Sequence, residues 1–226
     1  MLRKTTTRFS LFFFSIVIIE LICDSNPSLK SVHYFAKPAI VISLLFYFIR
    51  NSQHLNSRLK NLTILGLVFS VVGDILLMFV DASANYFILG LAAFLCAHIM
   101  YILVFLKHRN DAINPIWLIF ILLVYGSGLF YLLNAGLGDL LIPVIVYMIV
   151  ILTMGTTAYL RKNKVTKASF NWVLIGAILF MISDSILALN KFYQELWHAP
   201  ISIMLTYAMA QYCITFGILK LKPNLR

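Results

Sequence analysis

The feature that most constrains this chain is a series of eight long apolar runs, each separated from the next by a short polar connection. A segment of about 20 predominantly apolar residues crosses the ~30 Å hydrocarbon core of a bilayer as an α-helix. A membrane-spanning β-barrel would instead show segments of about 10 residues that alternate in polarity. We therefore expect an all-α polytopic membrane protein, a bundle of eight transmembrane helices. The runs cover residues 9–23, 34–49, 62–80, 86–105, 115–133, 140–160, 170–189 and 199–219.

The overall composition agrees with a membrane protein. Hydrophobic residues make up 62% of the chain and charged residues only 12%, and the mean hydropathy is +0.93, whereas soluble domains are close to half apolar. No linker or low-complexity segment divides the chain, so we expect a single domain over residues 1–226. The three cysteines are an odd number and all lie in apolar stretches, which argues against a disulfide scaffold.

The positive charge is distributed unevenly along the chain. The net charge is +10, and fifteen of the eighteen Lys and Arg residues lie in the two terminal segments or in alternate connections. Cytoplasmic loops carry an excess of Lys and Arg, so we expect both termini in the cytoplasm. The cation-rich segments are the N-terminus, the connections 50–61, 106–114 and 161–169, and the C-terminus that ends at Arg226. These cations form no single basic face, so we expect no nucleic-acid partner. We expect the lipid bilayer to be the partner instead, and in a bacterium the inner membrane would be the location.

Two acidic residues, Asp74 and Asp184, lie inside apolar runs and are the leading candidates for chemistry. An ionisable group within a span is costly and is a functional hypothesis by default. Both lie five or six residues before the outer ends of their runs, about 7–9 Å below the boundary at about 1.5 Å per residue. If the carboxyls face each other, repulsion leaves one neutral and one ionised, as general acid–base catalysis requires. The alternative is a structural hydrogen-bonding role in the bundle.

A faint internal repeat surrounds these two aspartates. Gly66-x7-Asp74-x2-Leu77 matches Gly176-x7-Asp184-x2-Leu187. Because three matching positions among apolar neighbours also arise by chance, the pattern indicates only a weak four-plus-four duplication of the single domain.

Other polar residues fall near the depth of the aspartates. Lys37 opens the second run from the outside, where it either binds a phosphate, neutralises an aspartate or extends to the interface. His98 and Tyr101 are three residues apart, and Tyr207 and Gln211 are four apart, so each pair lies on one helix face. These four side chains either line a pocket or link helices by hydrogen bonds. Glu20 is expected to be a helix-end residue.

Several reaction classes are disfavoured by the spacing of residues. The five histidines never pair at metal-ligand spacing within a span, so we expect no metal. A serine-hydrolase Gly-x-Ser-x-Gly elbow is absent from the sequence. The Tyr-Asp and Gly-x-Gly-Asp motifs of intramembrane aspartyl proteases are replaced by Ser183-Asp184 and Val71-Val72-Gly73-Asp74. A proton-coupled transporter and a noncatalytic lipid-binding protein stay open, because buried carboxyls serve those functions too.

Five short motifs occur in order on successive expected spans. They are Lys37-Pro38, Ser70-x2-Gly73-Asp74-x2-Leu77-Met78, Gly90-x3-Phe94-x3-His98-x2-Tyr101, Ser183-Asp184-x2-Leu187-Ala188 and Tyr207-x3-Gln211. On these residues the chain resembles the YhhN family of membrane lysoplasmalogenases over nearly its full length.

The resemblance implies an ether hydrolase that cleaves the vinyl ether bond of lysoplasmalogens, which are alkenyl-glycerophosphoethanolamines or -cholines. The products would be a fatty aldehyde and glycerophospho-ethanolamine or -choline. Asp74 and Asp184 would be the catalytic pair, and no organic cofactor would be needed. The substrate-binding residues would be Lys37, His98, Tyr101, Tyr207 and Gln211.

Overall fold

A computed structural model describes residues 2–222, and over this range the chain forms eight long α-helices and three short 3-10 segments, without strands. Each of the eight is long and apolar enough to cross a membrane, which confirms the predicted all-α polytopic architecture. The helices are α1 (Leu2–Asp24), α2 (Lys30–Asn51), α3 (Ser57–Leu77), α4 (Ala84–Leu106), α5 (Ile116–Leu133), α6 (Leu141–Tyr159), α7 (Lys167–Phe192) and α8 (Ala199–Leu219). The 3-10 segments are Pro27–Leu29, Asn134–Gly136 and Gly138–Leu140.

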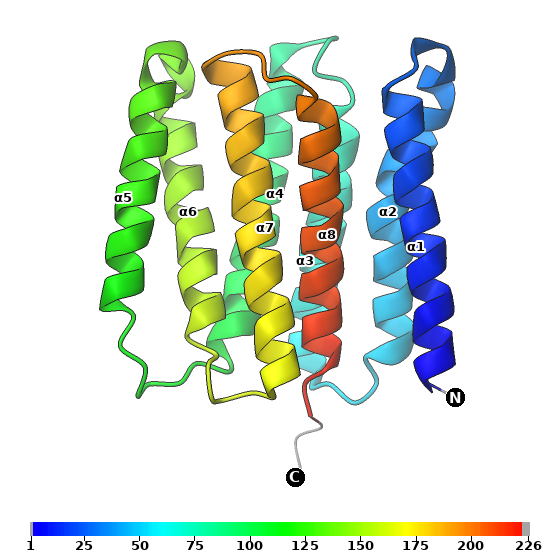
Figure 1. Ribbon diagram of the computed structural model, residues 1–226, viewed down its shortest axis with the longest axis vertical. Coiled ribbons are helices and arrows are strands. Elements are labelled where there is room, and N and C mark those ends of the chain that lie inside the picture. Colours follow the sequence, from blue (N-terminus) through cyan, green and yellow to red (C-terminus); the bar gives the residue numbers. More distant parts are fainter. Residues whose placement is uncertain (1, 223–226) are drawn as a thin grey trace.

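The helices run side by side as an up-and-down bundle, with both termini at one end (Figure 1). The cation-rich connections 50–61, 106–114 and 161–169 lie at that same end. Arg226, which we counted with the C-terminal cations, lies outside the described residues, as do the side chains of Arg3 and Lys4. The shared end of the termini is the arrangement that the charge pattern predicts, and the cytoplasmic orientation stays a prediction.

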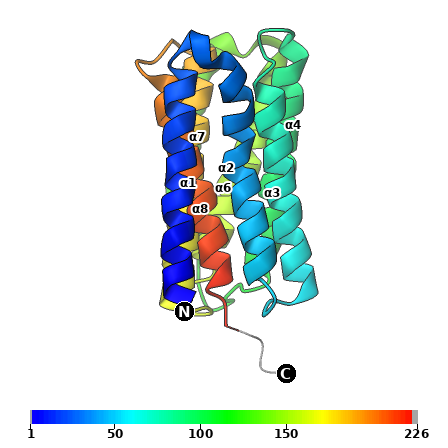
Figure 2. The same ribbon diagram turned by 90° about the vertical axis from the view of Figure 1, so that its right-hand side faces the viewer.

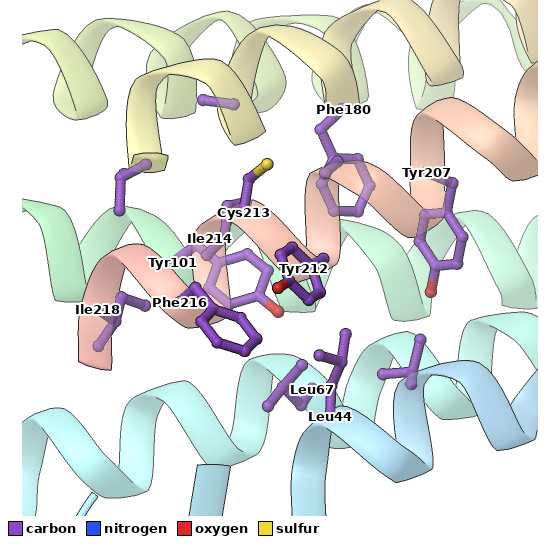
Figure 3. Packing of buried hydrophobic residues seen from close by; sticks show 14 of the residues in the cluster. Leu44, Leu67, Tyr101, Phe180, Tyr207, Tyr212, Cys213, Ile214, Phe216 and Ile218 are labelled. Carbon is purple, nitrogen blue, oxygen red and sulfur yellow. The ribbon is translucent and has the colours of Figure 1, made fainter. Parts of the chain in front are cut away.

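Helix α8 occupies the interior of the bundle and α5 its edge. Of the α8 span, 67% is buried inside the protein, compared with 17% of the α5 span. Helix α8 contacts α1, α2 and α7, whereas α5 packs against α6 and α7 (Figures 1 and 2). Figure 3 shows aromatic and aliphatic side chains of α8 meeting Leu44 of α2, Leu67 of α3, Tyr101 of α4 and Phe180 of α7. The core therefore forms around the last helix of the chain.

Close approach of α7 and α8 depends on Gly176. A Cβ atom at this position would lie 2.7 Å from Ile214 Cγ1 and 2.9 Å from both the Ala210 carbonyl oxygen and the Ile214 backbone nitrogen. Backbone atoms cannot move aside as a side-chain tip can, so the contact requires glycine. Small residues serve in this way at helix contacts inside membranes, where packing contributes much of the association energy.

A buried arginine links helices at the end of the bundle that holds the termini. Arg161 follows α6 and is fully buried, and its guanidinium donates to Ser169 Oγ at 2.9 Å. Ser169 Oγ in turn donates to the Gly217 carbonyl oxygen at 2.7 Å, and the guanidinium lies 5.5 Å from the Phe105 ring centre. Burial lowers the pKa of Arg161 to about 10, so it stays charged at neutral pH. One of the four cations predicted in the 161–169 loop thus ties helices together instead of facing water.

We expect Gly176→Ala to destabilise the protein by about 1–3 kcal/mol, because the added methyl group overpacks the α7–α8 contact. Gly128→Ala on α5 is the matched control, since nothing lies within 4 Å of its Cβ position. That substitution should leave stability unchanged or raise it by about 0.5–1 kcal/mol through helix propensity. Thermal unfolding of the purified proteins in detergent measures both effects, and equal midpoints for the two variants would contradict the packing argument.

The predicted orientation can be tested by labelling cysteines in intact cells. In a chain whose native Cys23, Cys96 and Cys213 are replaced by alanine, Lys164→Cys and Asp139→Cys place single thiols on exposed loops at opposite ends of the bundle. We expect a membrane-impermeant maleimide to label the cysteine at 139, and to label the one at 164 only after permeabilisation. The opposite pattern would reverse the topology.

Candidate active site

The two intramembrane aspartates line a single cavity of about 830 Å³ at the end of the bundle opposite the termini. Asp74 comes from the last turns of α3 and Asp184 from the half of α7 that lies away from the end holding the termini. Asp74 is 2% exposed, and the Asp184 side chain is 16% exposed. The structure therefore brings together the two carboxyls that the sequence singled out, on the wall of one space.

Asp74 is held by a tyrosine from the centre of the bundle. The Tyr207 hydroxyl on α8 donates to Asp74 Oδ2 at 2.9 Å. The Tyr207 ring is fixed edge-to-face by Phe94 and Phe180, at centroid distances of 5.6 and 5.5 Å. Gly73 leaves room for the Phe94 ring, since a Cβ atom at position 73 would lie 2.6 Å from that ring. The packing of the Tyr207 ring and the hydrogen bond from its hydroxyl together fix the position of the Asp74 carboxyl.

A second polar group lies one helical turn deeper than Asp74. The Tyr101 hydroxyl donates to Gln211 Oε1 at 2.7 Å, and Gln211 Nε2 donates to Ser70 Oγ at 2.8 Å. Ser70 Oγ donates to the Gly66 carbonyl oxygen at 2.9 Å. Tyr101 and Gln211, which we predicted to bind substrate, are fully buried behind the cavity wall and joined to each other. Their geometry links α3, α4 and α8, and their substrate-binding role stays a prediction.

Asp184 has a different set of neighbours. The Tyr147 hydroxyl on α6 donates to Asp184 Oδ2 at 2.6 Å. His98 Nε2 on α4 lies 3.8 Å from the same oxygen, and neither ring nitrogen of His98 has a hydrogen-bond partner among the described residues. The His98 ring is packed edge-to-face on Phe180, with centroids 4.6 Å apart. The 3.8 Å separation is too long for a direct hydrogen bond between the imidazole and the carboxyl.

Asp184 also stands where two spaces of different polarity meet. On its other side is an apolar pocket between α4, α5, α6 and α7. Phe87, Asp184, Leu187 and Phe192 line both this pocket and the larger cavity. The remaining pocket wall includes Leu129, Met148, Leu152 and Met181. A ligand with a polar head and a hydrocarbon chain would place the junction between its two parts beside this carboxyl.

Charged side chains gather in the wall of the larger cavity. Lys37 lines it, as the sequence suggested. Glu20 lies near the end of α1, as expected of a helix-end residue, yet it is only 1% exposed and also lines the cavity. Other charged residues in the wall are Asp24, Asp81, Lys191 and Glu195. The cavity can therefore receive a ligand that carries both signs of charge.

Sequence reasoning missed Tyr147 and underrated Glu20. A tyrosine in the middle of an apolar span has no spacing that distinguishes it from a packing residue, so Tyr147 emerges only when α6 is placed beside α7. Glu20 carried a usable signal, because a carboxylate four residues before Asp24 lies on the same helix face.

The chain was compared with known proteins. A profile of the YhhN family matches residues 32–218. The human protein named lysoplasmalogenase TMEM86B is 35% identical over 154 residues, which cover 68% of this chain and 62% of that protein. Lysoplasmalogenase TMEM86B of Sus scrofa is 31% identical over 222 residues, 94% of this chain and 88% of the relative. A lysoplasmalogenase of Mycobacterium bovis is 27% identical over 191 residues, 82% and 71% of the two chains.

No solved structure gives a significant match to this chain. The family profile nevertheless covers most of the sequence, including both aspartates and the helices that position them. The similarity to the Sus scrofa protein extends over nearly the whole chain. This integral membrane protein therefore belongs to the YhhN family.

Proposed function

We propose that the protein is a lysoplasmalogenase that hydrolyses the vinyl ether bond of an alkenyl lysophospholipid within the membrane. The observation that carries the proposal is the position of Asp74 and Asp184 on one cavity wall, with Asp184 at the junction of polar and apolar space. The names of the relatives support the same activity.

The chemistry requires a proton donor, a water molecule and stabilisation of a cation. Protonation of the β-carbon of the vinyl ether gives an oxocarbenium ion, and water adds to the adjacent carbon. The resulting hemiacetal collapses to a fatty aldehyde and the free hydroxyl of glycerophospho-ethanolamine or -choline. A neutral carboxyl delivers the proton, and an ionised carboxylate stabilises the cation and activates water, as paired carboxyls do in glycosidases.

The hydrogen bonds of the two aspartates are compatible with these catalytic roles. Each aspartate accepts its tyrosine hydroxyl through Oδ2, and no described residue forms a hydrogen bond to Oδ1 of either one. Each carboxyl thus keeps one oxygen for substrate or water while the other fixes its orientation. Such pre-organisation lowers the barrier, because the groups need not be reordered during the reaction.

The two spaces differ in polarity as the two parts of a lysolipid do, although the apolar pocket is small, about 50 Å³, and could hold only the first carbons of the chain. The phosphate and head group lie in the cavity that holds Lys37, and the alkenyl chain extends past Asp184 into the apolar pocket. Exposed large apolar side chains cover α5, including Trp117 and Phe120, at 77% and 59% exposure. This edge faces lipid, so a substrate chain can enter sideways from the bilayer.

We expect Asp74→Asn and Asp184→Asn each to lower aldehyde release by about 100-fold or more, the usual contribution of general acid–base catalysis. Purified protein in detergent is assayed with alkenyl lysophospholipid, and the alkyl and acyl analogues should give no aldehyde. Asp139→Asn is the matched control, because Asp139 lies on an exposed loop outside both spaces.

Full turnover in either cavity variant would exclude the acid–base pair. If the wild-type protein released no aldehyde but gave pH-dependent flux in sealed vesicles, it would be a transporter instead. Binding of lysolipid without consumption would identify a noncatalytic lipid-binding protein.

Tyr147→Phe should reduce kcat by about 10-fold or more with a smaller change in KM, because a hydrogen bond to a charged group contributes about 1.5–3 kcal/mol. The tyrosine acts by positioning Asp184, so the pH profile of kcat should shift as well. Tyr131→Phe removes a hydroxyl from a side chain that is 82% exposed on α5 and serves as the control. Equal kinetics for the two variants would show that the Tyr147 hydroxyl does not contribute to the reaction.

A further inference from the structure

A cluster of three potential metal ligands lies where α1 and α2 meet at the outer end of the bundle. His33 Nδ1 is 3.5 Å from Glu20 Oε1 and 3.5 Å from Asp24 Oδ1. The ligand atoms of all three residues lie within 4.8 Å of one another. Glu20 and Asp24 are four residues apart in α1, and His33 is in the first turns of α2, so the cluster joins two helices.

The distances suit a tetrahedral ion. Zn²⁺ binds imidazole nitrogen and carboxylate oxygen at about 2.0–2.2 Å, and the ligand atoms of a regular tetrahedron are then separated by about 3.3–3.6 Å. Both contacts of His33 fall in this range. The carboxylate oxygens of Glu20 and Asp24 lie within 4.8 Å of each other, so they need approach by at most about 1.5 Å to complete the tetrahedral spacing.

Three polar atoms of the cluster are buried without a hydrogen-bond partner, whereas Asp24 is exposed. Glu20 is 1% exposed, and neither of its carboxylate oxygens nor His33 Nδ1 has a hydrogen-bond partner among the described residues. Lys37 lines the same cavity, but it forms no ion pair within 4.0 Å of these acids in the described part of the chain. A buried carboxylate without partners is costly, and a cation bound between these atoms would offset that cost.

We propose that Glu20, Asp24 and His33 form a Zn²⁺-binding site that links α1 to α2 at the mouth of the cavity. Three protein ligands leave a fourth position to water. Histidine spacing within single spans, on which the expectation of no metal rested, gives no sign of this cluster, because its residues come from two helices. The metal site does not depend on the proposed hydrolysis, since its residues are not among the proposed acid–base or positioning groups, although Glu20 and Asp24 line the same cavity.

Direct binding tests the site. Protein purified without a histidine tag is stripped with a chelator, dialysed and titrated with ZnCl₂ against a fluorescent competitor. We expect one Zn²⁺ per chain, with affinity at least about 10-fold lower in Glu20→Gln, Asp24→Asn and His33→Gln, because even the loss of an outer-shell partner costs 10–100-fold. His33→Cys should restore binding, since a thiolate is also a zinc ligand.

Two controls make the result specific. His54→Gln removes a histidine that contacts the Leu219 carbonyl oxygen at the opposite end of the bundle, and Asp139→Asn removes an exposed acid. Both should bind Zn²⁺ like the wild type. Zn²⁺ should also raise the unfolding temperature of the wild type and of both controls, but not of Asp24→Asn. Absence of stoichiometric binding, or unchanged affinity in all three ligand variants, would overturn the proposal.

Discussion

Inside hydrocarbon a polar side chain has no water to bond with, so its hydrogen-bond partners must come from the protein. Three hydrogen bonds connect different helices in the interior. They join Tyr207 of α8 to Asp74 of α3, Tyr147 of α6 to Asp184 of α7, and Tyr101 of α4 to Gln211 of α8. Each bond satisfies a buried group and also sets the relative position of two helices. The same interactions that stabilise the fold therefore orient the two carboxyls, and the site cannot be separated from the packing.

The bundle also divides its interior by polarity. The cavity that holds Lys37 and both aspartates contains charges of both signs, whereas the pocket between α5, α6 and α7 is lined almost entirely by apolar side chains. Asp184 belongs to both spaces. Under the proposed function, this division would align an amphiphilic substrate before any specific contact forms, because its chain and its head group each favour only one of the spaces. That alignment offers a physical reason for a bond next to the head group to react.

Hydropathy and charge were sufficient to predict eight helices with both termini at one end, since the thickness of the bilayer fixes the length of a span. They could not predict that α8 is central and α5 peripheral, because lipid and protein interior are equally apolar and select similar residues. The two aspartates were predictable from the cost of placing them in a span. Tyr147 was not, since its importance arises from a contact between α6 and α7. Glu20 could have been found from its place on the helix face of Asp24, four residues along the chain.

The predicted weak four-plus-four repeat can be compared with the neighbours of the two aspartates. Asp74 lies in the first half of the chain and receives its hydrogen bond from α8, while Asp184 lies in the second half with His98 of α4 beside it. Each carboxyl thus has a neighbour from the opposite half. The number of residues between Asp74 and Asp184 also separates Lys37 from Tyr147. Lys37 lines the cavity, whereas the Tyr147 hydroxyl donates to Asp184. Under the predicted four-plus-four duplication, the two copies would have diverged at this position, so that the two carboxyls have different neighbours.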